Sequence, residues 1–222
     1  MGHPSKDVLS QARRHSEKFP TGITFPKEQP ICRGCAEAKM HMPPFEDSTS
    51  RASSKFELIH SDLKELPITL YHKYKYFVTF LDDYSSHCWV ILLKKKSDTA
   101  DAIDTFLAMV RTQHNVLVKE FMTNAGGEYK SIDLKNKFKH LGIISRTSVP
   151  HMHQQNGRAE RLNRTLMEKA QAMRFVSCLP QNWWEFSVEY AVHVYNRIPV
   201  KRLAWHTPFE VLNGKKPDIS HL

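Results

Sequence analysis

The sequence has little cysteine, no long apolar run and a shortage of acidic residues. Two of its four cysteines, Cys88 and Cys178, stand alone inside apolar segments, which argues against a disulfide-stapled secreted domain. The most apolar stretches have the length of strands, and none is long enough to span a membrane. The first residues are polar and lack a signal-peptide pattern. We therefore expect a nuclear or cytoplasmic protein without a membrane partner.

The acidic shortage leaves the chain strongly basic. Its 222 residues include 32 Lys and Arg against 23 Asp and Glu, a formal charge of +9. Such a balance favours an anionic partner, of which nucleic acid is the default, although many other soluble proteins share it. Hydrophobic residues make up 41% of the chain, which is enough for a folded core.

Residues 1–42 have the pattern of a small separate module. Cys32 and Cys35 form a C-x-x-C pair, which can supply two ligands of a tetrahedral zinc site from one tight turn, and His3 is a candidate third ligand. A redox pair is the alternative, but no strand-to-helix context surrounds the two cysteines. Residues 43–55 are rich in proline, serine and charge, which indicates a linker.

From residue 56 to the end, at residue 222, the pattern is that of an α/β domain. Hydrophobic periodicity predicts strands at 56–63, 74–81, 87–93, 116–122 and 143–146, and helices at 97–114, 134–141, 157–176 and 180–196. The residues after 197 are expected to be loop-rich and basic. This order predicts a five-stranded mixed sheet flanked by helices.

The stretch 150–166 reads as a polar loop that leads into a basic helix. Ala159, Leu162 and Leu166 fall on one stripe of that helix, with Glu160 and Asn163 beside it. A glycine at the helix start allows a phosphate backbone to approach closely. We expect nucleic-acid contacts from the loop end and the arginines, namely Gln155, Asn156, Gly157, Arg158, Arg161 and Arg164. The alternative is a solvated helix with ordinary ion pairs.

Three oxygen-bearing side chains stand at the ends of predicted elements. Asp62 closes the first strand, Asn124 follows the fourth, and Glu160 lies on the helix after the fifth. Two-metal phosphoryl transfer requires carboxylates from separate elements that converge on one point. The acid pair Asp82 and Asp83 lies at a hairpin turn, where a structural role is favoured.

These phrases together resemble the integrases of copia-type LTR retrotransposons. The matching stretches are HSDL at 60–63, YFVTFLDDY at 76–84, TNAGGEY at 123–129, QQNGRAER at 154–161 and TPFE at 207–210. The resemblance implies a ribonuclease-H-like core that uses Mg²⁺ or Mn²⁺, acts on DNA ends and target DNA, and works as a homo-oligomer. It also implies a His-His-Cys-Cys zinc module, of which His3, Cys32 and Cys35 match the last three ligands. The absent first His and the early end suggest a fragment of a polyprotein.

The chain departs from the family at one metal ligand. The resemblance assigns Asp62, Asn124 and Glu160 as the catalytic metal-binding set, with thirty-five residues between the last two, but the family has Asp at the second position. An Asn brings a carbonyl oxygen without a negative charge. The loss costs on the order of several kcal/mol of metal and transition-state stabilisation, a rate loss of roughly a thousandfold or more.

We therefore expect an integrase core with impaired strand transfer. The alternative is a non-catalytic module for nucleic-acid binding or assembly, derived from an integrase. A nuclease of the same fold is a third reading, which the integrase phrases around Glu160 disfavour.

Overall fold

The computed structural model describes residues 51–66, 71–124, 126–129, 131–147 and 156–220. The chain separates into two units, residues 1–47 and 48–222, and the description concerns the second. The predicted zinc ligands His3, Cys32 and Cys35 lie outside the described residues, as does Gln155.

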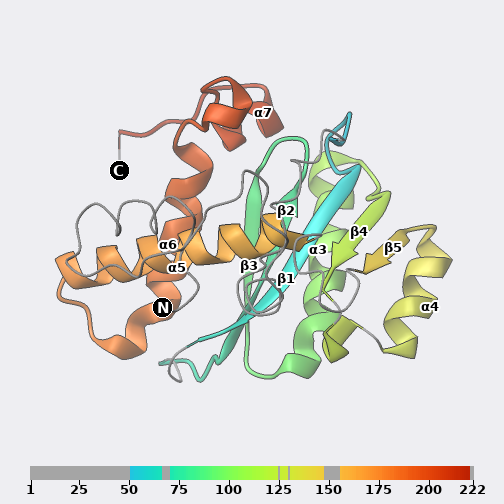
Figure 1. Cartoon of the computed structure of the whole chain (residues 1–222), viewed down its shortest axis with the longest axis horizontal. Coiled ribbons are helices and arrows are strands. Elements are labelled where there is room, and N and C mark those ends of the chain that lie inside the picture. Colours follow the sequence, from blue (N-terminus) through green and yellow to red (C-terminus); the bar gives the residue numbers. More distant parts are fainter. Residues whose placement is uncertain (1–50, 67–70, 125, 130, 148–155, 221–222) are drawn as a thin grey trace, which may run out of the picture. The chain divides into compact units, whose positions relative to one another are not determined.

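Five strands form one mixed sheet in the order β3-β2-β1-β4-β5 (Figure 1). The antiparallel part consists of β1 (Leu58–Glu65), β2 (Tyr76–Asp82) and β3 (Cys88–Leu93). The parallel part adds β4 (Glu120–Thr123) next to β1 and β5 (Ile144–Thr147) at the edge. Because β1 and β4 are parallel and their pairing ends at Ser61 and Thr123, the residues that follow these two in the chain lie near each other.

Helices cover both faces of the sheet. On one face α3 (Thr99–His114) and α4 (Ile132–Leu141) pack into a core with Val78 and Phe80 of β2. On the other face α5 (Gly157–Val176) and α6 (Trp184–Arg197) pack against Phe77 and Leu81. The alternation along β2 follows from the two-residue period of a strand, and it gives the domain two separate apolar layers. The three-layer arrangement confirms the predicted fold class.

Several element boundaries differ from the sequence-based ones. The fourth strand is shorter than predicted, since Val116 and Leu117 are exposed and pairing begins at Glu120. A helix, α7 (Pro208–Asn213), lies in the segment expected to be loop-rich. Its signals were local: the side chain of Thr207 accepts the N–H of Glu210, Pro208 follows the cap, and Gly214 closes the helix with φ of 71°.

The end of the predicted linker is bonded to the core. The backbone N–H of Ala52 donates to the carboxylate of Asp83 at 2.9 Å, and Lys55 Nζ donates to the carbonyl of Leu212. Phe56 is 1% exposed. The polar composition of residues 51–55 suits a linker, but it equally supplies donors for these contacts. In the part of the chain that is described, no helix is long and apolar enough to cross a membrane.

Candidate active site

Asp62 points from the middle of the sheet toward α5. Along β1, Ile59 and Ser61 face α3 and α4, where Ser61 Oγ lies 3.0 Å from the hydroxyl of Tyr129. His60 and Asp62 therefore face the opposite side, because neighbouring strand residues alternate. The side of the sheet covered by α5 thus holds the first predicted metal ligand, which is only 7% exposed.

Two asparagine amides bind the carboxylate of Asp62, one at each oxygen. Nδ2 of Asn124 donates to Oδ1 at 2.7 Å, and Nδ2 of Asn163 donates to Oδ2 at 2.9 Å. Asn124 reaches Asp62 because the parallel register of β1 and β4 pairs Ser61 with Thr123, the residues just before them. Asp62 is therefore held by two N–H donors from separate elements.

The orientation of Asn124 is fixed from its other end. Its side-chain oxygen accepts the backbone N–H of Gly126 at 3.0 Å, so the amide nitrogen is turned toward Asp62. An aspartate at this position would present two acceptors and no donor. The group next to the Asp62 carboxylate is thus an N–H where a cation site requires oxygen.

Asn163 is the site residue that sequence reasoning left without a role. It is 2% exposed, and its side-chain oxygen accepts the hydroxyl of Thr79 at 2.9 Å while its nitrogen serves Asp62. Thr79 lies opposite Asp62 on β2. The signal was its place on the helix, since residues three apart share a face and Asn163 follows Glu160 by three.

The first turn of α5 carries Glu160 over the sheet. Asn156, directly before the helix, is wholly buried, and its Nδ2 donates to the carbonyl of Ser61 at 3.0 Å. This contact ties the helix start to β1, and the nucleic-acid contact expected of Asn156 stays a prediction. Gly157 is also buried. Glu160 is half-buried on the turn between Asn156 and Asn163, two residues that both bond to the Ser61–Asp62 segment.

These residues only partly suit a pair of divalent cations. Asp62 and Glu160 supply the carboxylates that Mg²⁺ prefers, whereas Asn124 presents its amide nitrogen. Among the described residues, no group of three His, Cys, Asp or Glu side chains is placed to hold a metal ion. The donor set with Asn124 in this orientation therefore does not fit a two-metal site.

The three arginines of α5 that were predicted to bind nucleic acid have different environments. Arg161 and Arg164 are exposed. Arg158 is 18% exposed, and its guanidinium forms an ion pair with the buried carboxylate of Asp83. Burial, followed by the charges of Arg202 and Arg51, lowers the pKa of Arg158 to about 9. A phosphate contact stays a prediction for Arg161 and Arg164, while Arg158 has a partner within the protein.

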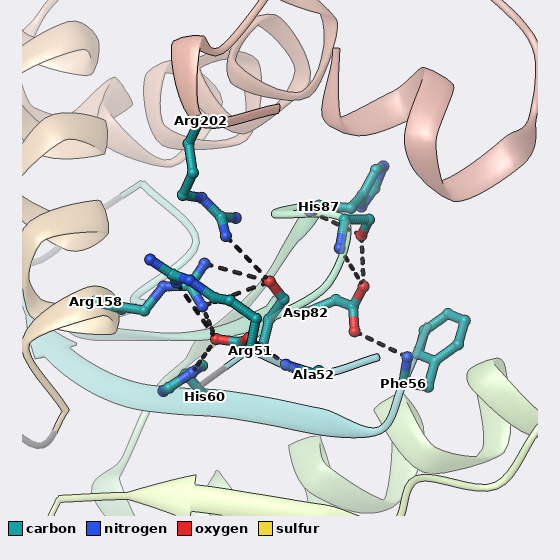
Figure 2. A network of polar contacts seen from close by, with 10 residues as sticks. Arg51, Ala52, Phe56, His60, Asp82, His87, Arg158 and Arg202 are labelled. Atoms are coloured by element: carbon teal, nitrogen blue, oxygen red, sulfur yellow. Dashed lines mark hydrogen bonds and ion pairs between the residues drawn. The ribbon is translucent and has the colours of Figure 1, made fainter. Parts of the chain in front are cut away.

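The acid pair of the hairpin has the structural role that the turn position favours. Asp82 accepts the backbone N–H of Phe56 at 2.8 Å and both donors of Ser85 (Figure 2). Asp83 accepts Nε2 of His60 at 2.9 Å. Burial, and after it the charge of Arg158, lowers the pKa of His60 to about 3, so its imidazole is neutral at pH 7. Both carboxylates are buried, which a turn sequence alone does not reveal.

Comparison with known proteins agrees with this architecture. The family described as "Integrase core domain" matches residues 52–153. The chain is 33% identical to the Pol polyprotein of transposon TNT 1-94 from Nicotiana tabacum, over 100% of this chain and 17% of that protein. It is 30% identical to the polyprotein of transposon RE2 from Arabidopsis thaliana, over 100% of this chain and 15% of that one. The chain thus spans about a sixth of these curated relatives.

Solved structures share the fold at low sequence identity. The simian T-cell lymphotropic virus intasome, in complex with the PP2A regulatory subunit B56 gamma, matches with a TM-score of 0.65 and 16% identity, over 86% of this chain and 68% of that chain. The HTLV-2 integrase catalytic core domain, in complex with magnesium in a trimeric form, matches with a TM-score of 0.55 and 18% identity, over 72% and 99%.

The sheet order, the helices on both faces and these structural matches define the ribonuclease-H-like fold that integrase catalytic cores have. The integrase core match and the similar transposon Pol polyproteins support a retrotransposon integrase, and the plant relatives are consistent with the copia type.

Proposed function

We propose that this chain is an integrase core whose ancestral reaction joins DNA 3′ ends to target phosphodiesters, and that Asn124 impairs the reaction in this copy. The observation that carries the proposal is the 2.7 Å hydrogen bond from Asn124 Nδ2 to Asp62 Oδ1. A divalent cation has to be approached by oxygen, and here the neighbour of Asp62 offers an N–H.

The Asp62 carboxylate is the part of the site that the fold preserves. Asn163 and Thr79 form a buried chain of hydrogen bonds that orients it, and Glu160 is on the same helix as Asn163. With a carboxylate also at position 124, Asp62 and Glu160 would help to hold Mg²⁺ or Mn²⁺, which would supply activation of an attacking oxygen and stabilisation of a leaving one. The replacement of one carboxylate by Asn124 removes a charge from that set and reverses the polarity of the contact with Asp62.

DNA is the proposed substrate. The basic balance of +9 and the exposed Arg161 and Arg164, on the helix that carries Glu160, support this proposal. The related intasome and the trimeric core lead us to propose a homo-oligomer as the working form. We also propose that residues 1–42 form a zinc module with His3, Cys32 and Cys35, that 43–55 link it to the core, and that the core occupies 56–222.

The same hydrogen bond favours a second function. With Asn124 bonded to Asp62, the site is satisfied internally without a cation, as expected for a non-catalytic module that binds nucleic acid or supports assembly. Such a module retains DNA affinity and lacks metal-dependent joining.

A strand-transfer assay separates the two functions. A labelled DNA end is incubated with target DNA in Mg²⁺ and in Mn²⁺, with the unmodified chain and with Asn124→Asp. Joining by the variant at a rate at least about a thousandfold above that of the unmodified chain supports the impaired integrase. Equal joining by both contradicts the role given to Asn124. DNA binding without joining by either protein favours the non-catalytic module, and release of cleaved DNA without joined product favours a nuclease.

A further inference from the structure

Three arginines from distant parts of the chain converge on one buried aspartate. Arg51 precedes β1, Arg158 lies in the first turn of α5, and Arg202 lies in the short 3-10 helix after α6, Lys201–Leu203. Figure 2 shows their guanidinium groups directed toward the same point. Arg51 is 3.9 Å from Asp83 Oδ1, Arg202 donates to the Asp83 carbonyl at 3.3 Å, and Arg158 bonds to both the carbonyl and the carboxylate.

The cluster has more positive charge than the buried aspartate requires. Arg158 alone is enough to pair with the Asp83 carboxylate, and His60, its other side-chain partner, is neutral at pH 7. The neighbouring Asp82 carboxylate is satisfied by Phe56 and Ser85. Even with Asp82 counted, the three arginines exceed the carboxylates by one charge. The arginines also repel one another, since Arg202 and Arg51 contribute to the lowered pKa of Arg158.

The two outer arginines keep donors that face solvent. The side chain of Arg51 is 43% exposed and Arg202 is exposed, whereas Arg158 and Asp83 are 18% and 4% exposed. A guanidinium has five N–H donors, and the contacts to Asp83 use few of those on Arg51 and Arg202. Asp83 and Arg158 thus form a largely buried ion pair beside the guanidinium groups of Arg51 and Arg202. These two guanidinium groups keep N–H donors whose planar arrangement matches phosphate oxygens.

This cluster lies on the same side of the sheet as the candidate active site. His60, which contacts the Asp83 carboxylate, lies two residues before Asp62 on the same face of β1. Leu58, whose carbonyl accepts the Asp83 N–H, lies four residues before Asp62. Asp83 is therefore about 7–13 Å from Asp62 along the strand. Phosphates of one DNA strand rise about 3.4 Å per nucleotide along the helix axis. A backbone that passes Asp62 is therefore within about two to four nucleotides of Asp83 and its arginines.

We propose that Arg51 and Arg202, held by Asp83 and Arg158, bind a backbone phosphate of DNA about two to four nucleotides from the position at Asp62. This site is separate from Arg161 and Arg164, and it uses a residue before the core's first strand and one after α6. The inference rests on the proposed function, because it requires DNA to lie along this side of the sheet.

The test measures affinity for a short fluorescein-labelled duplex by anisotropy, in EDTA, between about 50 and 200 mM salt. The proteins are the unmodified chain, Arg51→Gln, Arg202→Gln, Arg202→Lys, and the control Arg111→Gln. Arg111 is an exposed arginine of α3, on the opposite side of the sheet. Loss of one phosphate contact reduces the slope of log K against log salt by about 0.9 and weakens binding several-fold. We expect this of Arg51→Gln and Arg202→Gln, while Arg202→Lys and Arg111→Gln keep the slope.

Thermal unfolding of each variant shows that it folds. Unchanged slopes in Arg51→Gln and Arg202→Gln, in a chain that binds the duplex, overturn the phosphate site and leave the proposed function intact. An equal reduction of the salt slope in Arg111→Gln also overturns the phosphate site, because the loss of any positive charge then has the same effect. If the unmodified chain does not bind the duplex, the proposed function as a DNA-binding integrase core is wrong. Titration with inorganic pyrophosphate then decides the site: binding that requires Arg51 and Arg202 retains an anion site there, and absence of binding overturns it.

Discussion

Asn124, which follows β4, and Asp62, within the neighbouring parallel strand β1, are joined by a hydrogen bond in which the amide donates and the carboxylate accepts, at 2.7 Å. Two aspartates in these places would repel each other and attract a cation between them. The exchange of one carboxylate for an amide converts that repulsion into an attraction that is satisfied within the protein. A single substitution can thus stabilise the fold and weaken the metal site together.

This relationship predicts that Asn124→Asp destabilises the metal-free chain. The variant replaces an N–H donor by a second carboxylate beside Asp62. We expect the free energy of unfolding in EDTA to fall by about 1–3 kcal/mol, through loss of the hydrogen bond and through charge repulsion. Urea denaturation with and without Mn²⁺ measures it, and Mn²⁺ restores the loss only in the variant. A variant that is as stable as the unmodified chain in EDTA speaks against the stabilising contact.

Asn163 is predicted to be structurally essential despite its polar side chain. Asn163→Ala leaves the buried Asp62 and Thr79 each without one partner, because the amide serves both. The free energy of unfolding is expected to fall by about 2–4 kcal/mol, because two hydrogen bonds are lost and the buried groups left behind have no contact with water. Arg164→Ala, on the exposed surface of the same helix, is the matched control and is expected to stay within about 0.5 kcal/mol. Equal effects of the two substitutions contradict the role of Asn163.

Removal of the Asp83 charge is predicted to lower the free energy of unfolding more than Asn163→Ala does. Asp83→Asn leaves the half-buried Arg158 without its counter-charge, and a broken buried ion pair costs about 3–5 kcal/mol. Glu168→Gln removes an exposed carboxylate from the same helix as Arg158 and is expected to change stability little. Chemical denaturation of both variants checks the difference. An Asp83→Asn protein as stable as the Glu168→Gln control shows that the ion pair is not needed for the fold.

Two buried histidines are expected to lower the free energy of unfolding in acid. Burial lowers the pKa of His60 and of His87 to about 3, so both are neutral in the folded chain near pH 7. In the unfolded chain they titrate near 6.5, so below that pH the unfolded state binds more protons. The free energy of unfolding therefore falls as the pH drops from about 6.5 toward 3, and these groups leave it unchanged above 7.

Denaturation of His87→Gln across this range is the check. Its stability is expected to fall less steeply with acid than that of the unmodified chain, by up to about 1.4 kcal/mol per pH unit. A parallel pH profile for the two proteins excludes a neutral buried His87.

Much of the fold and part of the site follow from the sequence, and the reasons are local. The stripe of Ala159, Leu162 and Leu166 is buried as the helical period predicts. Asp62 and Asn124 meet because each directly follows a residue of the paired Ser61 and Thr123 on parallel strands. The first strand itself ends later than predicted, since it continues past Asp62 to Glu65. Trp184 packs into the core, but Trp183, directly before it, is 41% exposed, since neighbouring residues at a helix start face different directions.

The contacts that periodicity does not determine were the ones missed. Asn163 binds Asp62 and Thr79, and Asp83 gathers residues as distant in sequence as Arg51 and Arg202. Such partnerships depend on how the segments pack, and polar residue types alone do not specify which of many possible partners will be chosen.

The measurement that tests the account most directly is calorimetric titration of Mn²⁺ into the unmodified chain and into Asn124→Asp, with Asn124→Asp/Asp62→Asn as the control. It needs no DNA and does not depend on assembly. The account predicts that Asn124→Asp binds Mn²⁺ at least about a hundredfold more tightly than the unmodified chain, since one added carboxylate charge contributes several kcal/mol beside a divalent ion. The control, which again has a single carboxylate at these two positions, is expected to lose that gain. Equal affinity of the unmodified chain and Asn124→Asp for Mn²⁺ would contradict the claim that Asn124 disables the site.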